Sequence, residues 1–226
     1  MADTTFAVEA NQEYSLNIDT ILQQKRLQLI LKRIFDILVS FVGLVILSPL
    51  FIVLAIVIVS DSKGSVFFKQ TRVGRNGVPF KIYKFRTMIE DAEAKGMQLT
   101  VGDDSRITNV GTFLRKTKID ELPQLINVFK GEMSFVGPRP EVPKYVELYT
   151  EDQRQVLMVR PGITDLASIE YRNESDLLVN TDNPEKIYVE EIMPKKLDLN
   201  MRYIERISFV TDIGIIFRTI SVVLIE

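Results

Sequence analysis

An uncharged apolar run over residues 37–59 constrains the fold of this chain more than any other feature. The run reads ILVSFVGLVILSPLFIVLAIVIV. As an α-helix it would be about 35 Å long, at about 1.5 Å per residue. This length matches the hydrocarbon core of a bilayer, which needs about 20 apolar residues to span. Its Ile, Leu, Val and Phe side chains favour insertion by roughly −5 to −10 kcal/mol. The sequence therefore predicts a segment inside the membrane.

Ser48 and Pro49 interrupt the run near its middle. Proline removes one helical N–H group and clashes with the preceding turn, which costs about 3 kcal/mol in a soluble helix. Within lipid, the Ser48 hydroxyl can bond back to a freed carbonyl. Because the insertion energy exceeds the cost of the proline, a sharp kink at this point is tolerated.

The residues on both sides of the run bear on its path through the membrane. Basic residues stand before it (Lys25, Arg26, Lys32, Arg33) and after it (Lys63, Lys69, Arg72, Arg75). Cytoplasmic flanks carry an excess of Lys and Arg. A helix–break–helix over residues 25–63 would keep both clusters on one face, so we favour a re-entrant membrane helix. The alternatives are a straight single span that holds an extracytoplasmic binding domain, and a buried core helix of a soluble protein.

Composition limits the chemistry that this chain can perform. It contains no Cys, which excludes disulfides, thiolate nucleophiles and Cys-ligated metal sites, and no His, which removes the commonest general base. Catalysis must rest on Asp, Glu, Lys, Tyr or Ser, and a metal would be a hard cation such as Mg²⁺. Residues 63–86 carry only basic charges, which suits an anionic headgroup or phosphate. We expect no nucleic-acid partner.

The pattern along the chain predicts a mixed α/β fold that is mainly helical. Residues 1–24 are read as a polar tail that becomes helical toward its end, and residues 64–226 as a small cytoplasmic catalytic domain. The pair Asn76-Gly77 predicts a β-hairpin over residues 65–88. Residues 208–226 form an amphipathic helix, either core-facing or lying on the bilayer surface. Its apolar stripe consists of Phe209, Ile213, Ile216, Phe217, Ile220 and Leu224.

Adjacent carboxylates at Asp120 and Glu121 are the first candidates for chemistry. They precede an apolar helical pattern, so Asp120 can be an N-cap. Alternatively, the pair supplies a nucleophile or metal ligand at a helix N-terminus, where the helix dipole favours negative charge and attracts phosphate. Adjacent residues of a helix do not face each other. A paired role for Asp120 and Glu121 therefore needs one of them outside the regular helix.

Several basic residues are candidate phosphate ligands. In the segment Gly137-Pro138-Arg139-Pro140, two prolines hold Arg139 extended and Gly137 permits close backbone approach. A rigid arginine suits bidentate phosphate binding, although the segment can also be a surface turn. By strand alternation Lys84 and Arg86 share one face. Arg115, with Lys116 and Lys118, forms a basic cluster that is either a solvated face or part of the site, and Arg160 is a further candidate.

Five motifs in this order carry a resemblance to a known family. They are Lys32-Arg33 with Asp36, the apolar run with Ser48-Pro49, the stretch from Tyr83 to Met88, Asp120-Glu121-Leu122-Pro123-Gln124-Leu125, and Gly137-Pro138-Arg139-Pro140. Over about residues 30–220 the chain resembles the bacterial sugar transferases, the monotopic phosphoglycosyl transferases, in their small form.

The resemblance implies an activity, a cofactor and a location. The family moves a sugar-1-phosphate from a nucleoside diphosphate sugar, usually a UDP-sugar, to polyprenyl phosphate and releases UMP. Its Asp-Glu dyad matches Asp120 and Glu121. The Asp forms a covalent phosphosugar intermediate, and Mg²⁺ binds at the dyad. Arg115 matches a family arginine. We thus expect a bacterial inner-membrane enzyme of polysaccharide biosynthesis, with its catalytic domain on the cytoplasmic face; a homodimer is left open.

The chain departs from the family pattern at two places. After Thr164 the family often has a Gly-Trp-Ala-Gln type stretch, whereas this chain has Asp165-Leu166-Ala167-Ser168. Near the C-terminus it has Asn200 where small members often carry Asp. These changes bear on sugar and acceptor specificity and leave the dyad intact. The competing interpretation is a non-catalytic, membrane-anchored scaffold that binds anionic lipid or a nucleotide sugar.

Overall fold

The computed structural model describes residues 18–90, 92, 104–179, 181 and 183–225. The first 17 residues of the predicted tail lie outside this described part. Residues 18–24 are helical, and Ile18 is buried in the main core with 1% of its surface exposed. The last seven residues of the predicted tail are therefore packed against the domain that follows.

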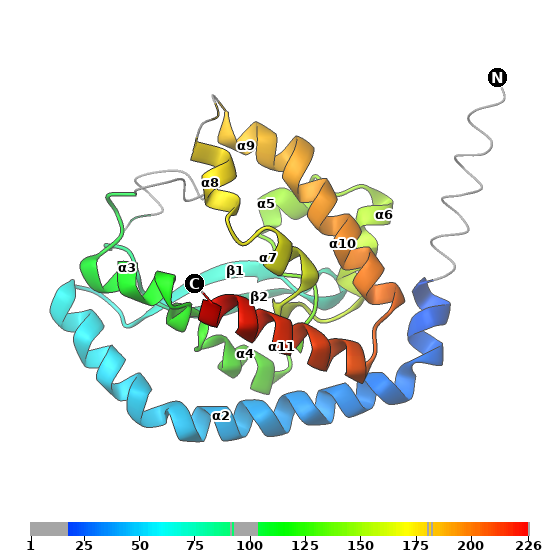
Figure 1. The fold of residues 1–226 in the computed structure, drawn as a ribbon, viewed down its shortest axis with the longest axis horizontal. Coiled ribbons are helices and arrows are strands. Elements are labelled where there is room, and N and C mark those ends of the chain that lie inside the picture. Colours follow the sequence, from blue (N-terminus) through cyan, green and yellow to red (C-terminus); the bar gives the residue numbers. More distant parts are fainter. Residues whose placement is uncertain (1–17, 91, 93–103, 180, 182, 226) are drawn as a thin grey trace.

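The apolar run lies within one long helix, α2 (Arg26–Asp61), which curves around one side of the molecule (Figure 1). It is the one helix in the described chain that is long and apolar enough to cross a membrane. Only 11% of its most apolar window is buried, whereas the core helix of a soluble protein is mostly buried. The face toward the domain buries the polar Lys32, Asp36 and Ser40 in the first half of α2 and the apolar Leu54 and Ile58 in the second. The outward face exposes residues such as Leu38, Phe41, Ile46 and Ile56.

The predicted break at Pro49 is absent, because α2 continues through it as a helix. The Ser48 hydroxyl donates to the Val45 carbonyl oxygen at 2.8 Å, and this is the carbonyl that Pro49 leaves without its helical N–H partner. The serine therefore compensates the proline, as the sequence predicted, and α2 is a single bent helix instead of two helices with a gap.

The predicted β-hairpin is confirmed. Strands β1 (Phe67–Val73) and β2 (Pro79–Phe85) pair in antiparallel register from Phe67 opposite Phe85 to Val73 opposite Pro79. The turn η1 (Arg75–Gly77) places Asn76 at φ 57° and Gly77 at φ 75°. These positive φ angles explain why Asn-Gly is favoured at this turn.

A second, parallel pair of short strands was not predicted. Strand β3 (Ser134–Val136) pairs with β4 (Gly162–Thr164). Just after β3 the two backbones approach closely: a Cβ atom on Gly162 would lie 2.2 Å from the Gly137 nitrogen, and one on Gly137 would lie 2.4 Å from the Arg160 oxygen. Only glycine fits at both positions, so the expected close approach at Gly137 is confirmed.

The remaining described elements are helices and helical turns, which makes the fold mixed but mainly helical (Figure 1). They are α3 (Asn109–Lys116), η3 (Ile119–Glu121), α4 (Gln124–Lys130), α5 (Pro143–Val146), α6 (Glu151–Arg154), η4 (Gln155–Met158), α7 (Leu166–Glu170), α8 (Glu174–Val179), α9 (Pro184–Ile187), the π-helical turn η5 (Tyr188–Ile192), α10 (Met193–Glu205) and α11 (Phe209–Ile225). The main core gathers side chains of β3, α5, η5 and α10, among them Val136, Tyr145, Tyr188 and Tyr203.

The C-terminal helix α11 turns a polar residue inward. Asp212 is 4% exposed and forms an ion pair with Lys32 of α2, whereas Phe217 and Ile220 of the predicted apolar stripe are 66% and 48% exposed. Of the two sequence interpretations, this orientation disagrees with a stripe that faces the core. The Lys32 ammonium also donates to the Val136 carbonyl oxygen at 2.8 Å, so α2, β3 and α11 meet at one lysine.

Candidate active site

The dyad lies on a tight turn between two helices. Asp120 and Glu121 belong to the 3₁₀ turn η3, which follows α3 and precedes α4. Lys118 starts this turn in the left-handed region, at φ 57°. The N-cap of α4 is Pro123, so Asp120 is not the helix cap that the sequence allowed. Both carboxylates are outside the regular α-helix, which meets the condition for a paired role.

Glu121 is held by two cations from distant segments. Lys84 of β2 donates to its Oε1 atom at 2.7 Å, and Arg139 donates to Oε1 at 2.5 Å and to Oε2 at 3.3 Å. Burial alone would raise the pKa of the Glu121 carboxyl, but the charges and hydrogen bonds of Arg139 and Lys84 outweigh it and hold the pKa well below its usual range. Glu121 is therefore a fixed anion.

Asp120 has a different environment, although it is the next residue. Only 6% of its surface is exposed, and its Oδ1 atom is buried without a hydrogen-bond partner in the described structure. Burial raises the pKa of Asp120; the charges of Lys84 and Arg115 oppose this, and Glu121 adds to it. Buried carboxylate oxygens in native proteins are usually paired. The unpaired oxygen of Asp120 is therefore available to bind a metal cation or to attack an electrophilic phosphorus.

The Arg139 loop is fixed from behind by a carboxylate that sequence reasoning missed. The Arg139 backbone N–H donates to Asp165 Oδ2 at 2.9 Å. Asp165 is fully buried, caps α7 and accepts the Ser168 N–H group with its other oxygen at 2.5 Å. In the sequence, Asp165 stood out only as a departure from the family pattern. Its contact with Arg139 spans 26 residues, so local spacing gave no sign of it.

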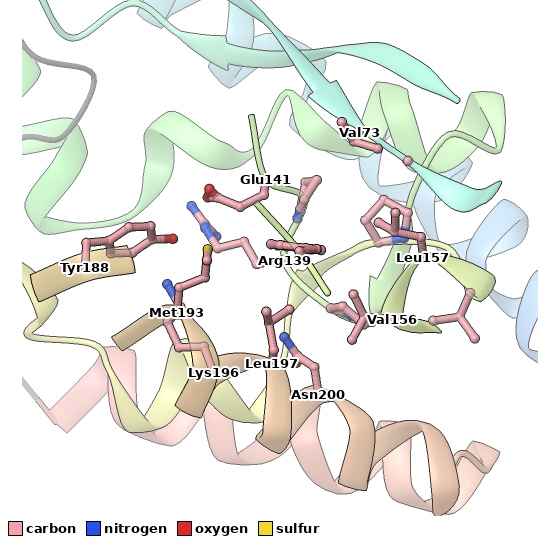
Figure 2. A pocket seen from close by; sticks show the side chains of 16 residues that line it. Val73, Arg139, Glu141, Val156, Leu157, Tyr188, Met193, Lys196, Leu197 and Asn200 are labelled. Carbon is pink, nitrogen blue, oxygen red and sulfur yellow. The ribbon is translucent and has the colours of Figure 1, made fainter. Parts of the chain in front are cut away.

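The second departure also lies beside the Arg139 loop. Arg139 and Glu141 lie opposite Met193, Lys196 and Asn200 across a cavity of about 40 Å³ (Figure 2). Asn200 is 4% exposed, and its Oδ1 atom is buried without a partner in the described structure. A water needs about 10–15 Å³ of such volume, so the cavity has room for roughly three waters.

The other predicted phosphate ligands occupy three different places. Arg115 lies in the last turn of α3 and contributes to the electrostatics of Asp120. Arg86 is bound to the end of α2, where it donates to the carbonyl oxygens of Ser62 and Lys63, both at 2.6 Å. Arg160 donates to the Gly131 carbonyl oxygen at 2.9 Å and lines a separate cavity.

The structure thus brings Lys84, Arg115 and Arg139 to the dyad, but it does not bring Arg86 or Arg160 there. β2 ends at Phe85, so strand alternation does not carry Arg86 to the face of Lys84 as the sequence suggested. Asn127 of α4 aligns β2 with the dyad: it accepts the Tyr83 N–H group at 3.0 Å and donates to the Lys81 carbonyl oxygen at 2.7 Å. The functional roles of all these residues stay predictions.

The dyad matches the way in which proteins usually bind Mg²⁺, through one or two carboxylates, waters and substrate phosphates. The described residues contain no group of three or more acidic side chains that could enclose a metal alone. The free Oδ1 atom of Asp120 fits the role of a ligand. Both oxygens of Glu121 accept hydrogen bonds from cations, so Glu121 is less suited than Asp120 to bind a metal ion.

Comparisons with known proteins show the family of this chain. Residues 27–226 match the family model described as "Bacterial sugar transferase". The chain is 41% identical over 199 residues to the "Uncharacterized sugar transferase EpsL" of Bacillus subtilis. This alignment covers 88% of this chain and 89% of that protein. It is 40% identical to the "Exopolysaccharide production protein PSS" of Rhizobium leguminosarum, over 86% of this chain and 95% of that one.

A longer relative carries an activity in its name. The chain is 39% identical to the "UDP-glucose:undecaprenyl-phosphate glucose-1-phosphate transferase" of Klebsiella pneumoniae, over 86% of this chain. The matched part spans 40% of the length of that relative. The similarity thus extends over nearly all of this chain and over less than half of that protein.

Proposed function

Because the chain belongs to the bacterial sugar transferase family, we propose that it transfers a sugar-1-phosphate from a UDP-sugar to polyprenyl phosphate and releases UMP. The observation that carries this proposal is Asp120, a buried carboxylate with an unpartnered oxygen, beside a Glu121 that two cations neutralise. The names of relatives that act on undecaprenyl phosphate support the same reaction class. The reaction would be the first membrane step of glycoconjugate synthesis.

We propose a reaction in two steps with a covalent intermediate. An Asp120 carboxylate oxygen attacks the sugar-linked phosphorus; a bond from that oxygen to phosphorus forms, and the bond from phosphorus to the oxygen of UMP breaks. Polyprenyl phosphate then attacks the same phosphorus, which yields polyprenyl diphosphate sugar and frees the carboxylate. Carboxylates are known covalent phosphoryl acceptors. Glu121 keeps Arg139 and Lys84 in place, where their charges can stabilise the phosphoryl oxygens.

We also propose Mg²⁺ as the cofactor of this site. Asp120 would hold it, with Glu121 as the second candidate ligand, and the ion would supply positive charge against the diphosphate. The remaining ligands would be waters and phosphate oxygens, as is usual for Mg²⁺.

The decisive experiment looks for the intermediate directly. The purified chain is incubated with a panel of UDP-sugars without acceptor, and its intact mass is measured. We expect an added mass of one sugar phosphate, which disappears in Asp120→Asn. Asp198→Asn, which changes an exposed carboxylate on α10, is the matched control and should keep the adduct. With both substrates varied, initial rates should follow ping-pong kinetics.

Three other outcomes of this experiment would lead elsewhere. An adduct that survives Asp120→Asn disproves the assignment of the nucleophile. Sequential kinetics without an adduct would indicate direct attack by the lipid phosphate. Binding of a nucleotide sugar without UMP release from any member of the panel would favour the non-catalytic scaffold.

We further propose that α2 is re-entrant and places the domain on the cytoplasmic face of the inner membrane. Both flanks of the apolar run are basic. In addition, both ends of α2 contact the same domain: Arg33 donates to the Val128 and Phe129 carbonyl oxygens of α4, and Arg86 binds the opposite end of α2. A straight span would separate these two ends by about the thickness of a bilayer.

Cysteine labelling tests this topology, since the chain contains no Cys of its own. Single variants Lys25→Cys and Ser65→Cys should react with an impermeant maleimide in inside-out vesicles only. Arg154→Cys in the domain is the reference for the cytoplasmic side. Pro49→Ala should move a fraction of Ser65→Cys to the other side by favouring a straight helix. If Lys25→Cys and Ser65→Cys label from opposite faces in the parent chain, α2 is not re-entrant.

A further inference from the structure

A second cavity lies away from the dyad, between the first half of α2, the hairpin turn η1 and the end of η4. Its volume is about 390 Å³, far above the roughly 10–15 Å³ that one water needs. It is lined by Asp19, Leu22, Gln23, Arg26, Leu29, Lys32, Arg33, Asp36, Arg75, Asn76, Met158, Val159 and Arg160. None of the dyad, Lys84, Arg115 or Arg139 is among them, so this is a separate site.

The charged lining contains more cations than the protein neutralises. Arg75 donates through Nε to the Met158 carbonyl oxygen at 3.1 Å, and Arg160 donates through Nε to the Gly131 carbonyl oxygen at 2.9 Å. Arg33 donates to two carbonyl oxygens of α4. Within the described part of the chain, none of these three arginines forms an ion pair with a carboxylate. The outer nitrogens of Arg75 and Arg160 also remain without a protein acceptor there.

Two acidic residues, Asp19 and Asp36, also line the cavity, so its cations outnumber its carboxylates. Asp36 accepts the Phe135 N–H group at 3.2 Å, and Lys32 is paired with Asp212. Burial lowers the pKa of Arg160, and the charges of Arg33 and Arg75 lower it further, with only Asp36 in opposition. The three arginines thus repel one another across the cavity, and an anion placed between them would relieve that repulsion.

The chemistry of the arginines specifies the class of ligand. Planar guanidinium groups bind phosphate through paired hydrogen bonds, and their outer nitrogens are the ones that remain available on Arg75 and Arg160. The cavity also lies against the helix whose opposite face is the exposed apolar one. We propose that this cavity binds a phosphate-bearing anion, carried by a phospholipid headgroup or by a soluble phosphate, at a site distinct from the dyad.

Two probes distinguish the sources of phosphate, and both use the full chain in detergent. Native mass spectrometry counts the phosphatidylglycerol and phosphatidylcholine molecules that stay bound, and calorimetric titration measures the affinity for inorganic pyrophosphate. The variants are Arg75→Gln, at an exposed turn position that should fold normally, and Arg160→Gln. The control is Arg154→Gln, which removes an exposed arginine that also donates to a carbonyl oxygen, at 3.3 Å from Glu147.

We expect each cavity variant to bind its phosphate ligand at least about tenfold more weakly, the loss typical of one charge-assisted hydrogen bond. Selective loss of phosphatidylglycerol identifies a lipid headgroup, and loss of pyrophosphate affinity alone identifies a soluble phosphate. The proposal is overturned if neither probe distinguishes the two variants from the parent chain, or if Arg154→Gln weakens binding equally. If Arg139→Lys weakens pyrophosphate binding and the two cavity variants do not, pyrophosphate binds at the dyad and the proposal is also overturned. Adduct formation at Asp120 is measured separately, so either proposal can fail alone.

Discussion

At the scale of single residues, two adjacent carboxylates acquire opposite properties from their partners. Glu121 accepts hydrogen bonds from Lys84 and Arg139, which keep its pKa low, whereas Asp120 is buried with a free oxygen and its pKa is raised. A pair of acids whose environments separate their pKa values is a common arrangement for dividing roles in catalysis. Lys84 is the residue through which this division can be tested.

We predict that Lys84→Met shifts the acid limb of the activity profile to higher pH. Lys84 is the strongest of the charges that lower the pKa of Asp120, so without it this raised pKa rises further and the nucleophile loses its charge at a higher pH. Lys81→Met is the control, because Lys81 lies on the same strand and donates to Thr71 instead. The measurement is kcat/KM between about pH 4 and 8, where a shift of about one pH unit corresponds to 1.4 kcal/mol. An acid limb that does not move would show that Asp120 is not the group being titrated.

The same variant has a pH-dependent effect on stability. The pKa of Glu121 is depressed in the folded state. Such a carboxyl stabilises the fold above its unfolded pKa of about 4.3, and this contribution is lost as the pH falls through the folded pKa. We expect Lys84→Met to lower the free energy of unfolding by about 1–3 kcal/mol at pH 7. The difference from the parent chain should shrink below about pH 4, which melting curves in detergent can measure.

At the scale of elements, Arg86 holds the C-terminal end of α2. Its two outer nitrogens bind the Ser62 and Lys63 carbonyl oxygens and the Ser62 hydroxyl, and one also approaches the Ile58 carbonyl oxygen at 3.4 Å. The last carbonyls of a helix lack helical partners, and a cation there also complements the helix dipole. This arginine therefore attaches the membrane helix to the hairpin.

We predict that Arg86→Met loosens this end of α2 and lowers stability by about 2–4 kcal/mol, because several buried carbonyls lose a charged donor. Trypsin cleavage after Lys63 should become faster, and the melting temperature should fall. Arg202→Met is the control, since Arg202 forms an exposed ion pair with Asp198 on α10. If Arg86→Met abolished turnover with unchanged melting and proteolysis, Arg86 would act on substrate as a phosphate ligand.

At the scale of the whole molecule, the first and last described long helices are joined by buried charge. Lys32 of α2 and Asp212 of α11 form an ion pair whose side chains are 11% and 6% exposed. The Tyr203 hydroxyl donates to Asp212 at 2.7 Å, which adds α10 to the contact. The pair connects positions 180 residues apart and sets how α11 lies against the membrane helix.

We predict that Asp212→Asn destabilises the protein by about 3–5 kcal/mol, because it leaves the buried Lys32 charge without its ion-pair partner. The double variant Lys32→Met, Asp212→Leu should regain part of this loss, since neither charge then remains. Asp198→Asn, which breaks an exposed pair, should change the unfolding free energy by less than about 1 kcal/mol. Equal melting temperatures for Asp212→Asn and Asp198→Asn would mean that the buried pair does not hold the helices together.

The sequence by itself determined the features that depend on neighbouring residues. The uncharged run predicts the membrane helix, because insertion depends on summed side-chain hydrophobicity. Asn76-Gly77 predicts the hairpin, because two positive φ angles are a local requirement. Ser48 compensates Pro49 through a bond that spans only three residues. The order of motifs was sufficient to indicate the family, which the comparisons confirm.

Only the tertiary structure decided which charges meet. Spacing gave no means of distinguishing Arg139, which reaches Glu121 across 18 residues, from Arg86, which reaches the end of α2 across 24. Asp165 became part of the site because the parallel pairing of β3 with β4 places it behind Arg139. Burial of a charge requires a partner, and that partner is chosen by the path of the backbone, not by distance along the chain. For this reason a pattern of residues identifies the acids and bases of this protein, while their pairing depends on the complete fold.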